Sequence, residues 1–280
     1  MSLTEYQRAV CRTLANERLA HGEQYVAGGA ALNELLTAAR RSYDVDLFHD
    51  TQEALLAAWR ADRITLEQNG FEVKVMREYA TFVEAEITRG NDGVLLQWVQ
   101  DSAYRFFPLV EHPDFGLALH SFDLATNKVL ALVGRVEVRD WIDTITCHEK
   151  VQPFGFLVWA ACGKDPGLTP TFILEQASRS AHYSRKEIET LAFDDGTVPD
   201  PVALGAKWRA LLIDAAKTVA VLPEDTIGCC VLDSEGRLFT GTVETIPSAL
   251  TAGSLVFHSG CIRGAWPTIV NRSGTSQTIR

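Results

Sequence analysis

Several features that define large classes of proteins are missing from this 280-residue sequence. No apolar run reaches the roughly 18–20 residues that a membrane-spanning helix needs, so we expect no membrane contact. The first 20 residues, MSLTEYQRAVCRTLANERLA, carry charge in every turn and are not typical of a signal peptide. We therefore expect a cytoplasmic protein.

Cysteine and histidine do not occur at metal-binding or disulfide-framework spacings. The six cysteines are scattered, with no C-x-x-C or C-x-x-H pair. This usage predicts reduced thiols and argues against a zinc knuckle or a disulfide-stapled fold. His112 and His120 are likewise not at ligand spacing with any other His or Cys.

Net positive charge is also missing, because the chain carries a formal net charge of −10. A uniform basic surface that coats nucleic acid is thereby excluded, although a local basic groove is not. The acidic balance also suits a basic partner. Internal repeats and low-complexity linkers are absent from the sequence.

The amino-acid composition is that of an ordinary folded protein, with 46% apolar and 22% charged residues. Periodicity predicts a mixed α/β region over residues 1–120, with three alternating strands between about 71 and 99. Helices dominate residues 121–222, and residues 223–280 are expected to form a small β-rich segment. In that segment, GCCVLDSEGRLFTGTV predicts a hairpin with Ser234 to Gly236 in its turn.

The stretch RRSYDVDLF places two aspartates, Asp44 and Asp46, inside a short apolar strand. Side chains two residues apart share one face of a strand, so the two carboxylates lie close together and repel each other. Mg²⁺ is commonly held by one or two carboxylates plus phosphate oxygens of a substrate. The pair therefore favours a site for metal and nucleoside triphosphate; the alternative is an exposed edge strand with solvated acids.

A glycine pair precedes the aspartates by about 15 residues. Gly28 and Gly29 end the predicted strand QYVA and are followed by the predicted helix AALNELLTAA. Glycines at such a junction let a phosphate approach the backbone, and the helix N-terminus offers unpaired N–H groups to it. The order strand, Gly-Gly, helix, strand with D-x-D is more specific than any of its parts.

With these motifs in order, GGAALNELL followed by RRSYDVDLF resembles the DNA polymerase β-like nucleotidyltransferase superfamily. A closer resemblance is to the AbiEii/AbiGii toxin group, because FDLATNKVLALVGRVEVRDWID matches that group's later motifs, a helical lysine followed by R-D-x-x-D. The resemblance covers roughly residues 20 to 190. It implies an α+β fold with a polymerase β-like mixed sheet and flanking helices, then a helical region and the small β-rich C-terminal part.

The resemblance also implies roles for individual residues. Asp44 and Asp46 would bind Mg²⁺ or Mn²⁺ at the triphosphate and act in catalysis. Gly28 and Gly29 would cradle the phosphates. Ser42 lies two residues before Asp44, hence on the same strand face, and would hydrogen-bond a phosphate.

Two later residues complete the implied catalytic set. Lys128 would contact the nucleotide phosphates, although a lysine in an apolar helix often reaches solvent instead. Asp140 would act as a base or orient Lys128, although an acid at a helix start is often only a cap. Arg139 and Asp143, four residues apart, are equally consistent with a surface ion pair.

One position departs from the superfamily pattern. Such enzymes usually take a third carboxylate from a neighbouring strand, and the best-placed strand here, GVLLQWVQ, carries Gln97 instead. A glutamine cannot act as a base, which puts efficient catalysis in doubt. Asp101, Glu84 and Glu86 are the acids that could substitute.

Three functions follow from these patterns. In the first, the enzyme transfers an NMP from ATP, GTP or CTP to a hydroxyl acceptor, which within the toxin group is RNA, at the 3′ end of tRNA. A cognate antitoxin protein would then be the partner. In the second, the acceptor is a small molecule, as in antibiotic-modifying enzymes. In the third, the fold is retained for binding nucleotide or a partner without catalysis, which Gln97 would favour.

Overall fold

The computed structural model describes residues 3–180, 183–194, 196–270 and 276–278. It divides into two compact units, each discussed by itself. The first unit comprises Met1–Ala103, Leu109–Leu124 and Ala192–Thr197, and the second comprises Tyr104–Pro108, Ala125–Leu191 and Val198–Arg280. None of the helices in the described part of the chain is long and apolar enough to span a membrane.

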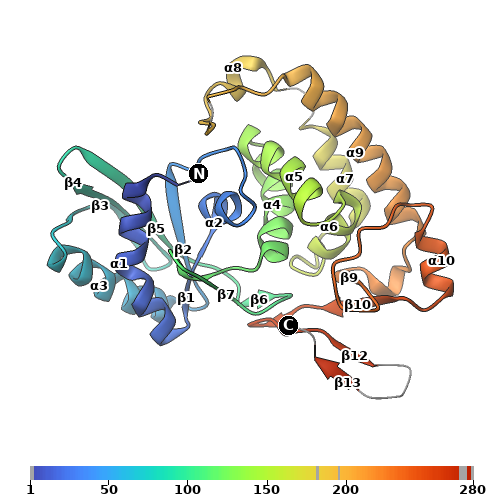
Figure 1. Ribbon diagram of the computed structural model, residues 1–280, viewed down its shortest axis with the longest axis horizontal. Helices are drawn as coiled ribbons and strands as arrows, with labels where there is room; N and C mark the ends of the chain where they lie inside the picture. Colours follow the sequence, from blue (N-terminus) through green and yellow to red (C-terminus); the bar gives the residue numbers. More distant parts are fainter. Residues whose placement is uncertain (1–2, 181–182, 195, 271–275, 279–280) are drawn as a thin grey trace. The chain divides into compact units, whose positions relative to one another are not determined.

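A seven-stranded mixed sheet forms the framework of the first unit, in the order β3-β4-β5-β2-β1-β8-β7 (Figure 1). Its strands β3, β4 and β5 form an antiparallel meander, and β5 then pairs in parallel with β2. This sheet with its flanking helices confirms the predicted α+β class. The strands are β1 (Gln24–Ala27), β2 (Asp44–His49), β3 (Glu72–Tyr79), β4 (Phe82–Arg89), β5 (Asp92–Gln100), β7 (Val110–His112) and β8 (Gly116–Ala118).

Two long helices, α1 (Glu5–His21) and α3 (Gln52–Gln68), cover one face of this sheet. Trp59 of α3 packs edge-on against Trp98 of β5 at 4.7 Å between ring centroids. The caps explain the helix starts, because Thr4 and Thr51 each accept a backbone N–H of the first turn. The short helix α2 (Gly28–Leu35) follows β1 directly.

The second unit is mainly helical. Its helices are α4 (Ser121–Arg135, from Ala125 onward), α5 (Val138–Lys150), α6 (Phe154–Ala161), α7 (Pro170–Ser178), α8 (Arg185–Ile188), α9 (Pro201–Val221) and α10 (Ile246–Thr251). Asp200 caps α9 by accepting the backbone N–H groups of Val202 and Ala203, and Pro201 occupies the first helical position.

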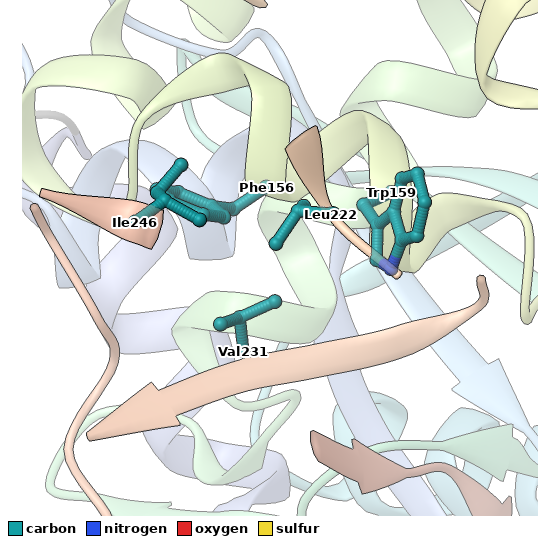
Figure 2. Packing of buried hydrophobic residues seen from close by; sticks show 5 residues of the cluster. All are labelled: Phe156, Trp159, Leu222, Val231 and Ile246. Atoms are coloured by element: carbon teal, nitrogen blue, oxygen red, sulfur yellow. The ribbon is translucent and has the colours of Figure 1, made fainter. Parts of the chain in front are cut away.

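An apolar cluster joins the helices of the second unit to its small sheet. Figure 2 shows Phe156 and Trp159 of α6 near Leu222, Val231 and Ile246, all of them buried. Burying a large apolar side chain contributes about 1.5–3 kcal/mol. The C-terminal strands are therefore part of the core of this unit, and the regions expected at 121–222 and 223–280 share it.

The predicted C-terminal hairpin forms, but it is short. In its turn the Gly236 amide donates to the Asp233 carbonyl at 3.0 Å, and across it the Asp233 and Phe239 amides donate to the Arg237 and Val231 carbonyls at 2.8 and 3.0 Å. The two arms meet at a Leu232–Leu238 bridge. The longer pairing of β9 (Cys229–Asp233) is with β10 (Leu255–Ser259), which the sequence did not predict. Phe239 of the second arm packs its ring against that of Phe156, with 5.6 Å between the ring centroids.

Short pieces complete the second unit. Strand β6 (Tyr104–Arg105) pairs with β11 (Cys261–Ile262), and β12 (Thr268–Val270) pairs with β13 (Ser276–Thr278). A 3-10 turn, η1 (Glu224–Thr226), follows α9. Its Thr226 carbonyl accepts the indole N–H of Trp159 at 2.8 Å.

Candidate active site

The alternation of β2 explains how two aspartates fit into an apolar strand. Asp44 and Asp46 are half-buried on one face of the sheet, whereas Val45, Leu47 and His49 are fully buried on the other. Because β2 lies between β5 and β1, it is an interior strand of the sheet, not an edge strand. The edge-strand alternative is therefore wrong, and both carboxylates sit on the same half-covered face, as the sequence predicted.

The glycine pair lies against these aspartates. Gly28 has a φ of 65°, in the left-handed region that favours glycine. A Cβ atom at this position would overlap the carboxylate of Asp46. A Cβ atom on Gly29 would come within 2.8 Å of Arg40 Nη2 and 2.9 Å of Ser42 Oγ. The missing side chains therefore bring the β1–α2 backbone into contact with the polar groups around β2.

Ser42 lies in the segment between α2 and β2 and contacts the first aspartate. Its hydroxyl donates to Asp44 Oδ1 at 2.8 Å, which fixes the orientation of this carboxylate. The Ser42 carbonyl accepts from Gln7 Nε2 of α1 at 2.9 Å, so this segment is tied to the body of the unit. Arg40, almost completely buried, donates from Nη1 to the Arg41 carbonyl at 3.0 Å.

Residues 192–194 pair with the segment that precedes β2. The Arg41 amide donates to the Ala192 carbonyl at 2.9 Å, and the Asp194 amide donates to the Ala39 carbonyl at 2.8 Å. Arg41 Nε also pairs with Asp194 Oδ1 at 2.7 Å. Both contacting segments belong to the first unit. A pairing between residues so far apart in the chain leaves no local pattern, so the sequence did not reveal it.

A row of polar side chains crosses four neighbouring strands next to Asp46. The ladder places Asp46 beside Gln97 of β5, Gln97 beside Glu84 of β4, and Glu84 beside Arg77 of β3. Gln97 Nε2 donates to Glu84 Oε2 at 2.8 Å, and Arg77 donates to both Glu84 oxygens at 2.8 and 2.9 Å. The position beside Asp46, where the superfamily pattern led us to expect a carboxylate, thus holds an amide.

The three acids considered as substitutes for this amide lie in different environments. Glu84 is buried and already accepts from Arg77 and Gln97. Glu86 is half-exposed and lies 3.7 Å from Lys74. Asp101 is exposed, beyond the end of β5, and accepts its neighbour's amide. Of these acids, Glu84 is therefore the nearest to the Gln97 position. It lies on β4, one strand further from Asp46 than Gln97 does.

The donor set around the aspartates fits a divalent cation that also contacts substrate. In the described part of the chain, no three His, Cys, Asp or Glu side chains are grouped closely enough to hold a metal ion by themselves. Two same-face carboxylates with a neighbouring glutamine amide offer only oxygen ligands from side chains, which Mg²⁺ and Mn²⁺ prefer. A Mg²⁺ ion with this few protein ligands normally completes its shell with water and phosphate oxygens.

An open groove of about 460 Å³ lies on the same side of the sheet, near the β4–β5 turn. It is lined by Tyr43 and Leu95, the chain neighbour and the ladder neighbour of Asp44, together with Glu86. Tyr43 is 69% exposed. An aromatic ring open to solvent can stack on a base. No sequence pattern indicates this groove.

In the second unit, Lys128 lies between two carboxylates. Its Nζ is 3.0 Å from Asp140 Oδ1 and 3.0 Å from Asp143 Oδ2, and all three side chains are buried. The lysine therefore does not extend into solvent. Asp143 does not form the surface pair with Arg139 that its spacing allowed, because Arg139 Nε instead lies 2.6 Å from Glu137.

Asp140 is more than a helix cap. It also accepts from Arg135 Nε at 2.6 Å and Nη2 at 3.0 Å. Burial raises the pKa of Asp140, but the hydrogen bonds from Arg135 and the charge of Lys128 outweigh it, so the pKa is held below its usual range. Asp140 is thus ionised at neutral pH and fixes the position of the Lys128 ammonium.

Comparison with known proteins gives only distant similarity. No family model matches the chain, and no curated protein is significantly similar to it. Among solved structures, a proposed nucleotidyltransferase from Helicobacter pylori is 13% identical with a TM-score of 0.49, covering 79% of this chain and 100% of its own. MenT4, a nucleotidyltransferase toxin from Mycobacterium tuberculosis, is 16% identical with a TM-score of 0.46, covering 79% of this chain and 86% of its own. At this level of similarity, function must be inferred from the chain's own residues.

Proposed function

We propose that this chain is a Mg²⁺-dependent nucleotidyltransferase that moves an NMP from an NTP to a hydroxyl acceptor. The observation that carries the proposal is the meeting of the glycine pair with the D-x-D pair at the ends of β1 and β2. Gly28 contacts Asp46, and Gly29 contacts Ser42, which bonds Asp44. Two motifs that the sequence holds apart thereby form one polar site.

The roles of the site residues follow from their chemistry. Gly28 is half-buried and begins α2, so its backbone would be the part of the pair that approaches a triphosphate, whereas Gly29 is buried beside Arg40 and Ser42. Arg40, in contact with Gly29, adds a positive charge, and Ser42 orients Asp44. Asp44 and Asp46 would hold the metal ion, which, when bound, neutralises charge on the phosphates and on the leaving pyrophosphate.

The reaction forms one bond and breaks one. The acceptor oxygen bonds to the α-phosphorus while the bond between this phosphorus and the pyrophosphate oxygen breaks, and the acceptor's proton passes to water. Gln97 cannot take this proton, and Glu84 is held by Arg77 and Gln97. We therefore expect a slow transfer step that relies on positioning and electrostatic stabilisation more than on a protein base.

For Lys128 and Asp140 we keep the roles that the family resemblance implies. The ammonium of Lys128 would stabilise substrate phosphates, and Asp140 would position it. The 3.0 Å contact between the two side chains supports the second role.

RNA is the acceptor class we propose, with the 3′ end of tRNA as the first candidate and an antitoxin as the protein partner. Both come from the resemblance to the AbiEii/AbiGii group. The basic side chains of the first unit add little support for an RNA acceptor. Arg63 is paired with Glu67 and Arg77 with Glu84, so their charges are partly neutralised. Arg105 is buried and offers no surface contact to RNA.

A second candidate is a protein that binds nucleotide without transferring it. The specific observation in its favour is that Gln97 is fixed by Glu84 at the place where a third carboxylate would help to hold metal and activate the acceptor. Such a protein would bind NTP through the same glycines and aspartates.

One experiment separates these functions. The purified protein is incubated with Mg²⁺, each α-labelled NTP in turn and total RNA, beside the double variant Asp44→Asn, Asp46→Asn. We expect label in RNA with the wild type only, in a band that identifies the acceptor. NTP binding that needs both aspartates but gives no transfer to RNA or small molecules would support the second candidate, and no NTP binding at all would contradict both.

A further inference from the structure

The open groove near the β4–β5 turn lies on one side of the aspartate pair, and the glycine pair lies on the other. In the sheet, β2 stands between β5 and β1, and β1 ends at Ala27, directly before the glycines. Asp44 is paired with Leu95 of β5, and Leu95 with Glu86 of β4, so the three side chains share one face. Leu95 and Glu86 both line the groove, which lies within the first unit. The groove therefore begins beside Asp44 and extends away from the glycines.

This order across the sheet bears on the direction of attack. In phosphoryl transfer the attacking and the leaving oxygen lie roughly in line, on opposite sides of the phosphorus. The proposed function places the triphosphate at Gly28, next to β1. The pyrophosphate would then leave on the β1 side of the aspartates, and the acceptor hydroxyl would approach from the β5 side, where the groove lies.

Two exposed apolar side chains line the groove. Tyr43 is 69% exposed, and its carbonyl accepts from Gln7 Nε2 of α1 at 3.5 Å, so its backbone is tied to the body of the unit. Met76 is 50% exposed and lies at an irregularity of β3, between Val75 and Arg77. A bulge at such a point re-aims a side chain. An exposed aromatic ring beside an adaptable methionine suits a flat, uncharged ring such as a nucleobase.

The polar groups of the groove suit a nucleoside better than a phosphate. Glu86 and Thr88 can accept hydrogen bonds from ribose hydroxyls or from the amino group of a base. Of the described residues, no lysine or arginine lines the groove, whereas Asp92 adds a second acid, so a phosphodiester inside it would be repelled. The Lys74 side chain, 71% exposed, has its Nζ 3.7 Å from Glu86, which places a positive charge at the rim. A phosphate just outside the groove could reach it.

We propose that this groove is the acceptor subsite and that it seats the unpaired 3′-terminal nucleoside of an RNA. The inference rests on the proposed transferase function and narrows its acceptor to a single-stranded end. The terminal base stacks on Tyr43, Glu86 accepts from a ribose hydroxyl, and the reacting hydroxyl lies towards Asp44. The phosphate that precedes this nucleoside stays outside, near Lys74.

RNA binding is measured first without NTP, so that it does not depend on catalysis. The probe is a short unstructured RNA labelled at its 5′ end, beside the same RNA with an abasic 3′-terminal nucleotide, and fluorescence anisotropy follows binding. Tyr43→Ala is compared with Tyr79→Ala, because Tyr79 is also exposed, at 64%, but does not line the groove. We expect Tyr43→Ala to weaken binding by roughly fivefold or more, the lower limit for stacking one base, and Tyr79→Ala to bind as the wild type does.

The abasic RNA shows whether Tyr43 acts on the terminal base. It should bind the wild type roughly fivefold or more weakly than the intact RNA, whereas Tyr43→Ala should bind the two RNAs equally, because the stacking partner is gone. Equal binding of the intact RNA by the two tyrosine variants, or of the two RNAs by the wild type, would overturn the proposal.

NTP binding separates this subsite from the proposed active site. Tyr43→Ala should bind NTP with Mg²⁺ as the wild type does, and its transfer to RNA should show a raised KM for RNA with little change in kcat. A lower NTP affinity in Tyr43→Ala would mean that the groove takes the base of the NTP, which would overturn the proposal. A wild type that binds no NTP, but whose RNA binding depends on Tyr43 and on the terminal base, would contradict the transferase function and still support the groove as a site for an RNA end.

Discussion

Gln97 is the direct neighbour of Asp46 across the parallel ladder of β5 and β2. A carboxamide therefore stands beside the D-x-D pair where a third acid was expected. Its amide donates to Glu84, so the orientation of the side chain is set by the sheet and does not depend on substrate. This arrangement keeps the proposed metal-binding pair but removes the obvious proton acceptor. The predictions below separate these two consequences.

Replacing one carboxylate of the pair should remove activity without unfolding the protein. Asp44→Asn keeps an oxygen that can accept from the Ser42 hydroxyl, so we expect the free energy of unfolding to change by less than about 0.5 kcal/mol. Loss of a metal ligand should lower nucleotide transfer by roughly a hundredfold or more. Labelled transfer and urea denaturation measure the two effects. Asp101→Asn, an exposed acid, is the matched control and should transfer normally.

The contact between Gly28 and Asp46 should make this glycine irreplaceable. Gly28→Ala forces an alanine into the left-handed backbone region, and its Cβ atom would overlap the Asp46 carboxylate. Gly90→Ala is the matched control, because its φ is 62° but nothing lies within 4 Å of the added Cβ. We expect Gly90→Ala to lower stability by about 1 kcal/mol and Gly28→Ala by a further ~1–3 kcal/mol, with loss of Mg²⁺-dependent NTP binding. Equal losses in the two variants would argue against the contact.

Local patterns were sufficient for the elements that carry the site. The alternation in YDVDLF predicted the strand and the shared face of Asp44 and Asp46. The glycine pair predicted the helix α2, which begins at Gly28 itself and not after Gly29, and which ends at Leu35, earlier than expected. These features depend on residues within one or two turns of each other, where periodicity and turn chemistry dominate. The position of Gln97 was expected from the family resemblance, because its place beside Asp46 depends on the parallel pairing of β5 with β2, which no local pattern determines.

Long-range contacts could not be predicted in this way. The longer pairing of β9 was not predicted, because its partner strand, residues 255–259, lies beyond α10. Nothing near Asp143 in the sequence indicates that it pairs with Lys128 in place of Arg139. The Gly29 contact with Arg40 also depends on how the chain folds back between α2 and β2. In each case the choice among chemically equivalent partners is made by tertiary packing.

Exchanging the two side chains of the Gln97–Glu84 pair tests the missing carboxylate. Gln97→Glu alone places two acids next to each other and should lower stability by about 1–2 kcal/mol. Adding Glu84→Gln restores a hydrogen bond in the opposite direction, so the double variant should regain most of this loss. Arg77, whose side chain is 56% exposed, loses little when its partner becomes neutral. We expect the double variant to transfer nucleotide several-fold faster than the wild type, measured in single-turnover assays; a rate at or below the wild-type value would mean that Gln97 is not the limit on catalysis.

The position of Lys128 allows a structural role to be separated from a catalytic one. Lys128→Met leaves Asp143 buried without this cation and should lower the free energy of unfolding by about 3 kcal/mol. Adding Asp143→Asn removes the uncompensated charge and should restore part of that stability. Transfer by the double variant is then compared with transfer by Asp143→Asn alone. A further loss of at least tenfold in the stable double variant would indicate that the ammonium itself acts on substrate, whereas equal rates would leave Lys128 a structural residue.

Stability in mildly acidic solution should depend on His49. Its pKa is about 4 in the folded protein because of burial, against about 6.5 in an unfolded chain. Between these values the unfolded state binds a proton that the folded state does not, so stability is fully present above pH 6.5 and is lost as the pH falls towards 4. The difference of about 2.5 pH units corresponds to roughly 3 kcal/mol. Urea denaturation from pH 7 to pH 4 should therefore show a steeper loss in the wild type than in His49→Leu, in which the other histidines still titrate; parallel curves would show that His49 is not held neutral by the fold.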